Sequence, residues 1–92
     1  MSLQFEWNDK KAISNKRKHG ISFEEATTAF GDELSITIDD PLHSEDEDRL
    51  ILISQSKTLK ILVVIHIEKR EDIRIISARK ATKKEQKIYE EV

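Results

Sequence analysis

The sequence predicts an α+β domain in which an antiparallel β-sheet carries N-terminal helices and one C-terminal helix. Three observations support this class. A short alternating run and two helix-start signals occupy the first third of the chain, four further strand-like runs follow, and a capped helical segment comes last. At 92 residues the chain is expected to form a single domain, residues 1–92, with room for one site.

The N-terminal segment predicts a strand followed by a helix. Residues 3–7 alternate apolar and polar side chains, as a half-buried strand does. Asn8 or the residue after it can cap a helix that runs to about residue 18, and Gly20 supplies the left-handed position that ends it. Because this helix has little apolar surface, we expect its polar residues Asn15 and His19 to make contacts.

A second helix and a second strand follow. Ser22 and Glu25 form a capping box, and apolar residues then recur at helical spacing up to Gly31. Residues 34–38 alternate, which predicts a half-buried strand that Asp39-Asp40-Pro41 ends.

Three more runs predict an antiparallel meander. They cover residues 49–55, 60–68 and 72–79 and are joined by short polar turns. The middle run is apolar on both faces at residues 61–65, so we expect it to be the central strand with helices on both sides.

The last two strands allow a register to be predicted. A loop at residues 69–71 places His66 opposite Arg74 on one face of the hairpin. Arg74 and Arg79 are five positions apart, so an unbroken strand sends them to opposite faces. Only a bulge or the strand end can bring the two arginines to one site.

The chain closes with a predicted helix. Thr82 and Glu85 form its capping box. Its apolar stripe is thin, and we expect Ala81, Ile88 and Val92 to dock it on the sheet.

Charge is segregated along the chain. The formal net charge is −2, yet residues 32–48 hold eight acidic residues and no lysine or arginine. The basic residues gather in the first helix and in the last strand and helix. If these flanks meet in space, they form a basic surface that attracts phosphates.

Several classes of protein are excluded. The chain has no cysteine, no glycine-rich phosphate loop and no paired histidine–glutamate metal helix, so neither a metal nor another cofactor is predicted. The acidic loop at residues 39–48, with His43, lacks the ligand spacing of a calcium loop and is expected to be solvated. No apolar run approaches the roughly 18 residues of a membrane span, and residues 1–4 lack signal-peptide features. We therefore expect a cytoplasmic protein with no membrane partner.

Four parts of the sequence resemble one known family. They are residues 5–7 (Phe-Glu-Trp), 15–26 with the motif Lys18-His19-Gly20, 73–80 (Ile-Arg-Ile-Ile-Ser-Ala-Arg-Lys) and 85–90. In this order they resemble BrnT, a toxin of bacterial type II toxin–antitoxin pairs. The resemblance implies a RelE-like sheet, RNA cleavage that blocks translation, and neutralisation by a co-encoded ribbon-helix-helix antitoxin of the BrnA type. The acidic loop departs from the family, since it carries more charge than the resemblance leads us to expect.

The candidate catalytic residues are His19, Arg74, Arg79 and His66. Histidine, arginine, lysine and tyrosine can cleave RNA through its own 2′-hydroxyl without a metal, because they supply a base, an acid and cations for the transition state. Arg79 is the strongest candidate for a phosphate ligand, since it lies where a strand ends and a helix begins. The structural alternatives are a helix-end role for His19, an ion pair from Arg79 to Glu85 or Glu90, and core packing for His66.

Five further residues are predicted to bind substrate. They are Lys16, Lys18, Arg49, Lys80 and Tyr89. Arg49 and Tyr89 can bind a phosphate or stack on a base, and each can equally hold the last helix in place.

Two other classes of function stay open on the residues alone. A non-catalytic nucleic-acid-binding module has the same basic flanks and leaves RNA intact. A protein-interaction subunit uses its charged faces only to bind another protein. A partner gene directly downstream distinguishes the toxin from both.

Overall fold

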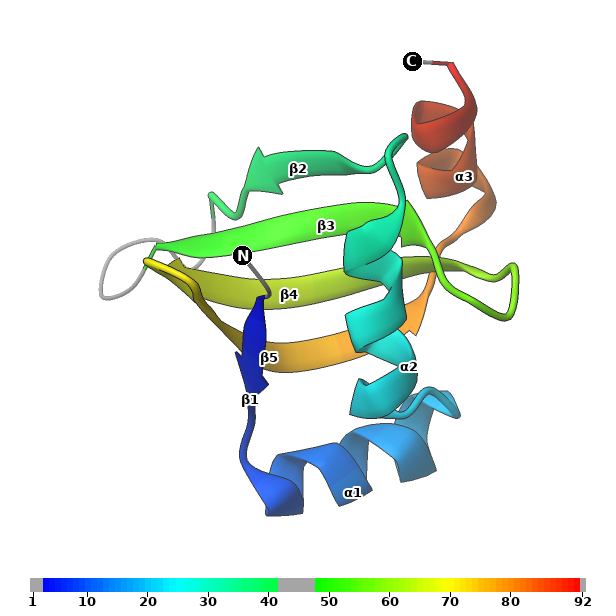
Figure 1. The fold of residues 1–92 in the computed structure, drawn as a ribbon. Helices are drawn as coiled ribbons and strands as arrows, with labels where there is room; N and C mark the ends of the chain where they lie inside the picture. The colour runs from blue at the N-terminus through cyan, green and yellow to red at the C-terminus, as the bar shows by residue number, and fades with distance from the viewer. Residues whose placement is uncertain (1–2, 42–47, 92) are drawn as a thin grey trace.

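The computed structural model describes residues 3–41 and 48–91. At its centre is a five-stranded sheet with the order β1-β5-β4-β3-β2 (Figure 1). The strands are β1 (Gln4–Glu6), β2 (Ile36–Asp39), β3 (Arg49–Gln55), β4 (Ile61–Lys69) and β5 (Asp72–Lys80). The helices are α1 (Asp9–His19), α2 (Phe23–Thr28) and α3 (Lys83–Glu90), and the 3-10 turn η1 (Ala29–Gly31) follows α2. The predicted α+β class is confirmed, and β4 is the central strand.

The sheet is mixed. Strands β2 to β5 form the predicted antiparallel meander. Strand β1 pairs in parallel with only the first three residues of β5, with Phe5 beside Ile73. Because β1 is short, it leaves the rest of that edge of β5 to α1 (Figure 1).

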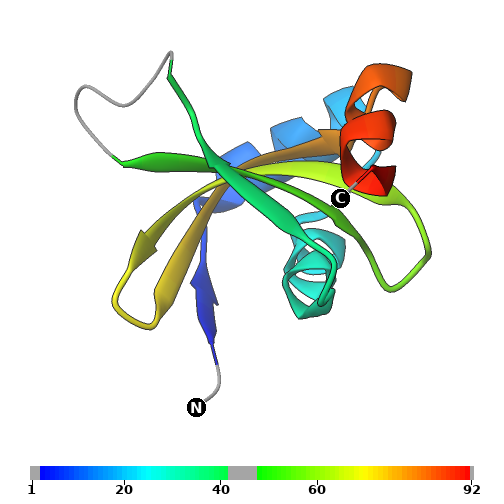
Figure 2. The same cartoon turned by 90° about the horizontal axis from the view of Figure 1, so that it is seen from above.

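Helices α2 and α3 lie on opposite faces of the sheet (Figure 2). On the α2 face, Phe23 and Ala26 join the main core with residues of β3, β4 and β5, such as Leu62. On the α3 face, Tyr89 packs on a smaller cluster that includes Val63. The apolar run of β4 is therefore buried on both faces because each side has a helix to cover it.

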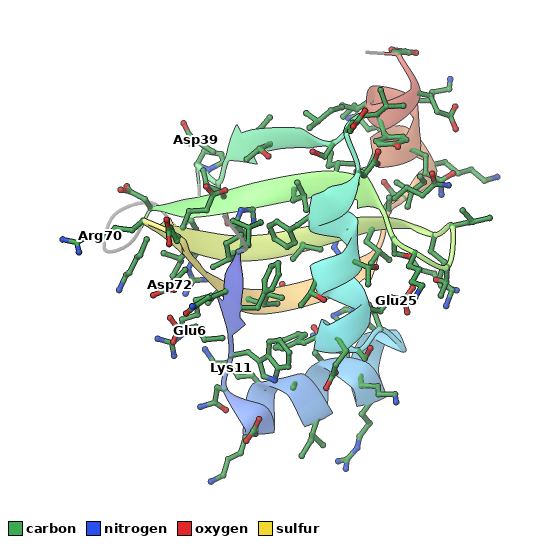
Figure 3. The ribbon with its side chains drawn as sticks, viewed as in Figure 1. Glu6, Lys11, Glu25, Asp39, Arg70 and Asp72 are labelled. Atoms are coloured by element: carbon green, nitrogen blue, oxygen red, sulfur yellow. The ribbon has the colours of Figure 1, made fainter. Side chains whose placement is uncertain are left out.

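Most helix ends follow the predicted caps. Helix α2 departs from them at its start and at its end, where the α-helix stops at Thr28 and the predicted terminator Gly31 belongs to η1. Asn8 accepts a hydrogen bond from the Lys11 amide at 3.1 Å, and Gly20 has φ 74°. The capping box of α3 is complete. At α2 only half of the box forms: Ser22 accepts from the Glu25 amide, while the Glu25 carboxylate accepts from hydroxyls of the β3–β4 turn. Figure 3 shows Glu25 on that side of the molecule.

The predicted register of the β4–β5 hairpin is wrong by one residue next to the turn and by two from Ile65 onward, where the pairing shifts again. The turn has two residues, and its first, Arg70, has φ 56°. As a result Ile67 lies opposite Arg74, and His66 lies opposite Ile75. Successive residues of a strand point to opposite faces, so His66 and Arg74 do not share a face.

Helix α3 docks through different residues from those predicted. Ala81 is buried as expected, but Ile88 is 42% exposed. Tyr89 takes its place on the sheet. Val92 lies outside the described residues, as do residues 42–47 with His43 and most of the predicted acidic loop. None of the helices in the described ranges is long and apolar enough to cross a membrane.

Candidate active site

Asn15 fixes α1 to the free edge of β5. Its side chain is only 7% exposed. The amide nitrogen donates to the carbonyls of Ala78 at 2.8 Å and Ile21 at 3.0 Å, and the amide oxygen accepts from the Ala78 N–H at 3.1 Å. A single side chain thus satisfies both backbone groups of Ala78, as a neighbouring strand does in a sheet.

A bulge in β5 lies next to this contact. Ile65 pairs with Ser77 and His66 pairs with Ile75, which leaves Ile76 as the extra residue. Because of the extra residue, odd-numbered and even-numbered side chains of β5 exchange faces of the sheet at the bulge.

This exchange of faces brings the two arginines of β5 to one face. Arg74 lies opposite Ile67, and Arg79 lies opposite Val63. Ile67 and Val63 are four residues apart on β4 and share a face, so Arg74 and Arg79 share that face as well. An unbroken strand with the same sequence separates them.

A groove of about 220 Å³ runs between α1 and the bulge. Ile76 and Ser77 form its sheet side, and Lys18 and His19 line it from the last turn of α1. Its other lining residues, all on α1, are Lys11, Ser14 and Asn15. The predicted meeting of the basic helix with the last strand therefore takes place here. Ser77 lies on the same strand face as Arg79, two residues before it.

Arg79 forms an ion pair with Glu85, which is the structural role that the sequence allowed as the alternative to phosphate binding. Its guanidinium donates to both carboxylate oxygens of Glu85, at 2.7 and 2.9 Å. Glu85 also accepts from the Thr82 amide as part of the α3 capping box. Arg79 lowers the pKa of Glu85 to about 2, and the same contact raises the pKa of Arg79. The guanidinium is thus held at the β5–α3 junction, where 39% of the side chain is still exposed.

Arg49 and Arg74 lie on either side of Ile67 across the sheet. Ile67 pairs with both arginines, from β3 and from β5. Arg74 also has Glu6 of β1 as its other neighbour. In the part of the chain that the structure describes, neither arginine makes an ion pair of 4 Å or less.

His66 has a packing role. Its side chain is fully buried, and its ring meets that of Phe30 edge-on with centroids 4.9 Å apart. The ring nitrogens contact the Glu68 carboxylate at 2.9 Å and the Val64 carbonyl at 3.3 Å. A ring enclosed in this way is not positioned to reach RNA.

Tyr89 holds α3 against the body of the protein. Its hydroxyl donates to Asp32 at 2.6 Å, which raises the pKa of Tyr89 to about 12. Asp32 also accepts from the Gln55 amide and the Ser54 hydroxyl. These hydrogen bonds lower the pKa of Asp32 against the opposing effect of its burial. The geometry therefore gives Tyr89 a structural contact, not a free hydroxyl for RNA.

The remaining predicted lysines lie apart from one another. Lys18 lines the α1–β5 groove. Lys16 faces a separate groove of about 410 Å³ on the other side of α1, next to Trp7 and Phe23. Lys80 lies at the end of β5 beside Gln86 of α3. The structure thus unites Lys18 with His19 and does not bring Lys16 into the same groove.

Two features of the groove were missing from the sequence-based site. Lys11 and Ser77 line it but were not among the site residues predicted from the sequence. Lys11 lies eight positions before His19, a helical spacing that a search from His19 along the helix can find. No pattern in a single sequence predicts the bulge that orients Ser77.

In residues 3–41 and 48–91, no group of three His, Asp or Glu side chains is placed to hold a metal ion.

The comparisons with known proteins define the class of this protein. A crystal structure of the Brucella abortus ribonuclease toxin BrnT matches with a TM-score of 0.69 and covers 89% of this chain and 100% of that chain. The two sequences are 22% identical, so this similarity establishes the fold. A search of curated proteins finds no match.

The sequence match is more specific. A family model described as the ribonuclease toxin BrnT of type II toxin–antitoxin systems matches residues 7–85. The class is therefore that of small ribonuclease toxins. The chain belongs to the BrnT family.

Proposed function

We propose that this protein is a toxin that cleaves RNA without a metal at the α1–β5 groove and thereby inhibits translation. The observation that carries the proposal is the groove itself, which places His19 and Lys18 of α1 beside Ser77 of β5. Family membership supports ribonuclease activity in general.

The reaction uses the RNA's own 2′-hydroxyl. The 2′-oxygen attacks the neighbouring phosphorus, the bond from phosphorus to the 5′-oxygen breaks, and a 2′,3′-cyclic phosphate and a 5′-hydroxyl form. One group must take the proton of the 2′-hydroxyl, and one must give a proton to the leaving oxygen. We assign one of these two roles to the imidazole of His19. Lys18 and Lys11 provide positive charge for the transition state from the same side of the groove.

An arginine of β5 is the second part of the proposed site. Because of the bulge, Arg74 and Arg79 lie on the strand face that also carries Ser77. A guanidinium has five N–H donors. Glu85 accepts from two nitrogens of Arg79 and the Lys80 carbonyl accepts from one of them, so donors still remain for a phosphate oxygen. Arg79 then binds phosphate while Glu85 holds it in place. Arg49 extends the cationic surface across β3.

We further propose that a co-encoded antitoxin neutralises the toxin. The family is described as part of type II toxin–antitoxin systems. A ribbon-helix-helix antitoxin of the BrnA type is the expected partner, as the resemblance in sequence implies. Such an antitoxin, bound over the basic groove, prevents RNA from reaching His19.

The test combines expression with analysis of the products. Controlled expression of the wild-type chain should stop growth and degrade RNA, and co-expression with the adjacent gene should restore growth. The purified protein should cleave an oligoribonucleotide equally well with and without EDTA, and it should leave cyclic phosphate and 5′-hydroxyl ends. Intact RNA that is bound with steep salt dependence supports a non-catalytic nucleic-acid-binding module instead. If RNA is neither bound nor cut, the chain is a protein-interaction subunit.

A further inference from the structure

The outer edge of β2 has backbone hydrogen-bonding groups that pair with no other described strand. Strand β2 is the last in the sheet order, and no described segment lies beyond it in Figure 1. The Asp40 amide donates to the Arg49 carbonyl at 3.0 Å, so it points toward β3. Since this direction alternates along an antiparallel strand, the N–H and C=O groups of Thr37 and Asp39 point outward. Such an edge can pair with another chain.

The same edge also has apolar surface. Ile38 is 47% exposed, and Leu34, just before the strand, is 69% exposed. Ile38 pairs with Ile51, which in turn pairs with Ile65, and both of these are only half-buried. Helix α3 packs on the other end of this face, around Val63 and Tyr89. An apolar strip is therefore continuous with the open edge.

Acidic side chains predominate around the edge, where Arg49 of β3, opposite Asp40, is a neighbouring cation. Glu33, Asp39 and Asp48 are exposed near the two ends of β2, and no lysine or arginine occurs in residues 32–48. Asp39 lies at the end of the strand in Figure 3. Natural edge strands are commonly protected by lysine or proline within the strand, and β2 has neither in Ile36–Asp39.

We infer that the β2 edge binds an extended segment of a partner protein in which apolar residues alternate with lysine or arginine. The backbone of that segment pairs with Thr37 and Asp39, its apolar residues pack beside Ile38, and its cations face the carboxylates. The binding surface lies at the edge of the sheet opposite the α1–β5 groove, because β2 and β5 are separated by β3 and β4. The inference is thus independent of the proposed catalytic site.

A peptide titration tests the inference. The probe is a synthetic nine-residue peptide in which valine alternates with lysine and arginine, and the control peptide has glutamate at every basic position. Binding to the full ¹⁵N-labelled chain is followed by amide chemical shifts. Thr37→Pro removes one outward N–H without touching the bonds to β3, and Thr37→Val is its matched control. Asp39→Lys tests the charge, and thermal melting checks that each variant is folded.

The expected result is binding with shifts confined to β2 and its neighbours on β3. Thr37→Pro should weaken binding at least tenfold, Asp39→Lys at least threefold, and Thr37→Val should have little effect. The inference fails if the peptide shifts the α1–β5 groove instead, if the glutamate peptide binds equally well, or if no shift appears at millimolar concentration. It also fails if the wild-type chain dimerises through β2 and excludes the peptide, since a second copy is then the occupant. Ribonuclease activity should be the same in all three variants, which separates this test from that of the proposed function.

Discussion

Asn15 shows how one polar side chain can determine the geometry of a site. It lies between α1 and β5 and forms three hydrogen bonds with backbone groups of Ala78 and Ile21. His19 follows it by one helical turn and lines the same groove. The position of His19 relative to the bulge therefore depends on this contact.

Replacement of Asn15 by alanine should destabilise the protein. We expect a loss of about 3 kcal/mol or more, since three buried backbone groups lose their partner and each costs roughly 1–3 kcal/mol. Urea denaturation measures this change in the free energy of unfolding. Arg17→Ala, on the exposed side of the same helix, should change stability by less than about 0.5 kcal/mol. Equal stability of the two variants would mean that the Asn15 contact does not hold α1 in place.

Among the contacts between elements, an ion pair between Arg79 and Glu85 stabilises the junction of β5 and α3. The Glu85 carboxylate accepts from Arg79 and from the Thr82 amide, and its pKa of about 2 lies below its ordinary value of 4.5. A lowered pKa in the folded state means that this stabilisation is complete above pH 4.5 and is lost as the pH falls toward 2.

Glu85→Gln should remove this pH dependence. The glutamine can still accept from Thr82, so the difference between the variant and the wild type reports the charged contact. The wild type should be more stable near neutral pH by about 1 kcal/mol, because the pair is partly exposed, and the two stabilities should converge as the pH falls below 4.5. Chemical denaturation at several pH values provides the measurement, with Glu90→Gln on the same helix as a control. A constant difference at all pH values would contradict the assignment.

Variants of Arg79 show whether this residue binds phosphate during cleavage or only forms the ion pair with Glu85. If Arg79 binds phosphate in the transition state, Arg79→Ala should abolish cleavage and leave the protein folded. Arg79→Lys should also be badly impaired, because lysine lacks the bidentate fork. RNA cleavage and melting temperature are measured for both. Full activity with a lowered melting temperature makes Arg79 structural, and Arg74 becomes the candidate ligand.

At the scale of the whole molecule, the elements were more predictable than their pairing. Caps and periodicity are local, so Asn8, Gly20 and Thr82 mark helix ends that the structure confirms. The parallel pairing of β1 was not predicted, because a three-residue strand carries no information about its distant partner. The β4–β5 register was wrong because the turn has two residues, Arg70 and Glu71, where a three-residue loop was expected, and the bulge at Ile76 shifts the pairing once more.

The same distinction applies to the candidate site. The meeting of a basic helix with the last strand could be predicted from charge, and the groove contains Lys18 and His19 as expected. The burial of His66 and the hydrogen bond from Tyr89 to Asp32 could not, since each depends on what the fold packs around the side chain.

The proposed function requires that RNA is cleaved at the α1–β5 groove. The most direct test is the single-turnover cleavage rate of an oligoribonucleotide by wild-type, His19→Ala and Arg17→Ala proteins, beside their melting temperatures. His19→Ala should lose about 100-fold or more in rate, in the range typical of a lost general acid or base, while its melting temperature stays close to that of the wild type. Arg17→Ala should cleave at nearly the wild-type rate. A folded His19→Ala protein that cleaves RNA as fast as the wild type would contradict the claim and place the reaction elsewhere on the molecule.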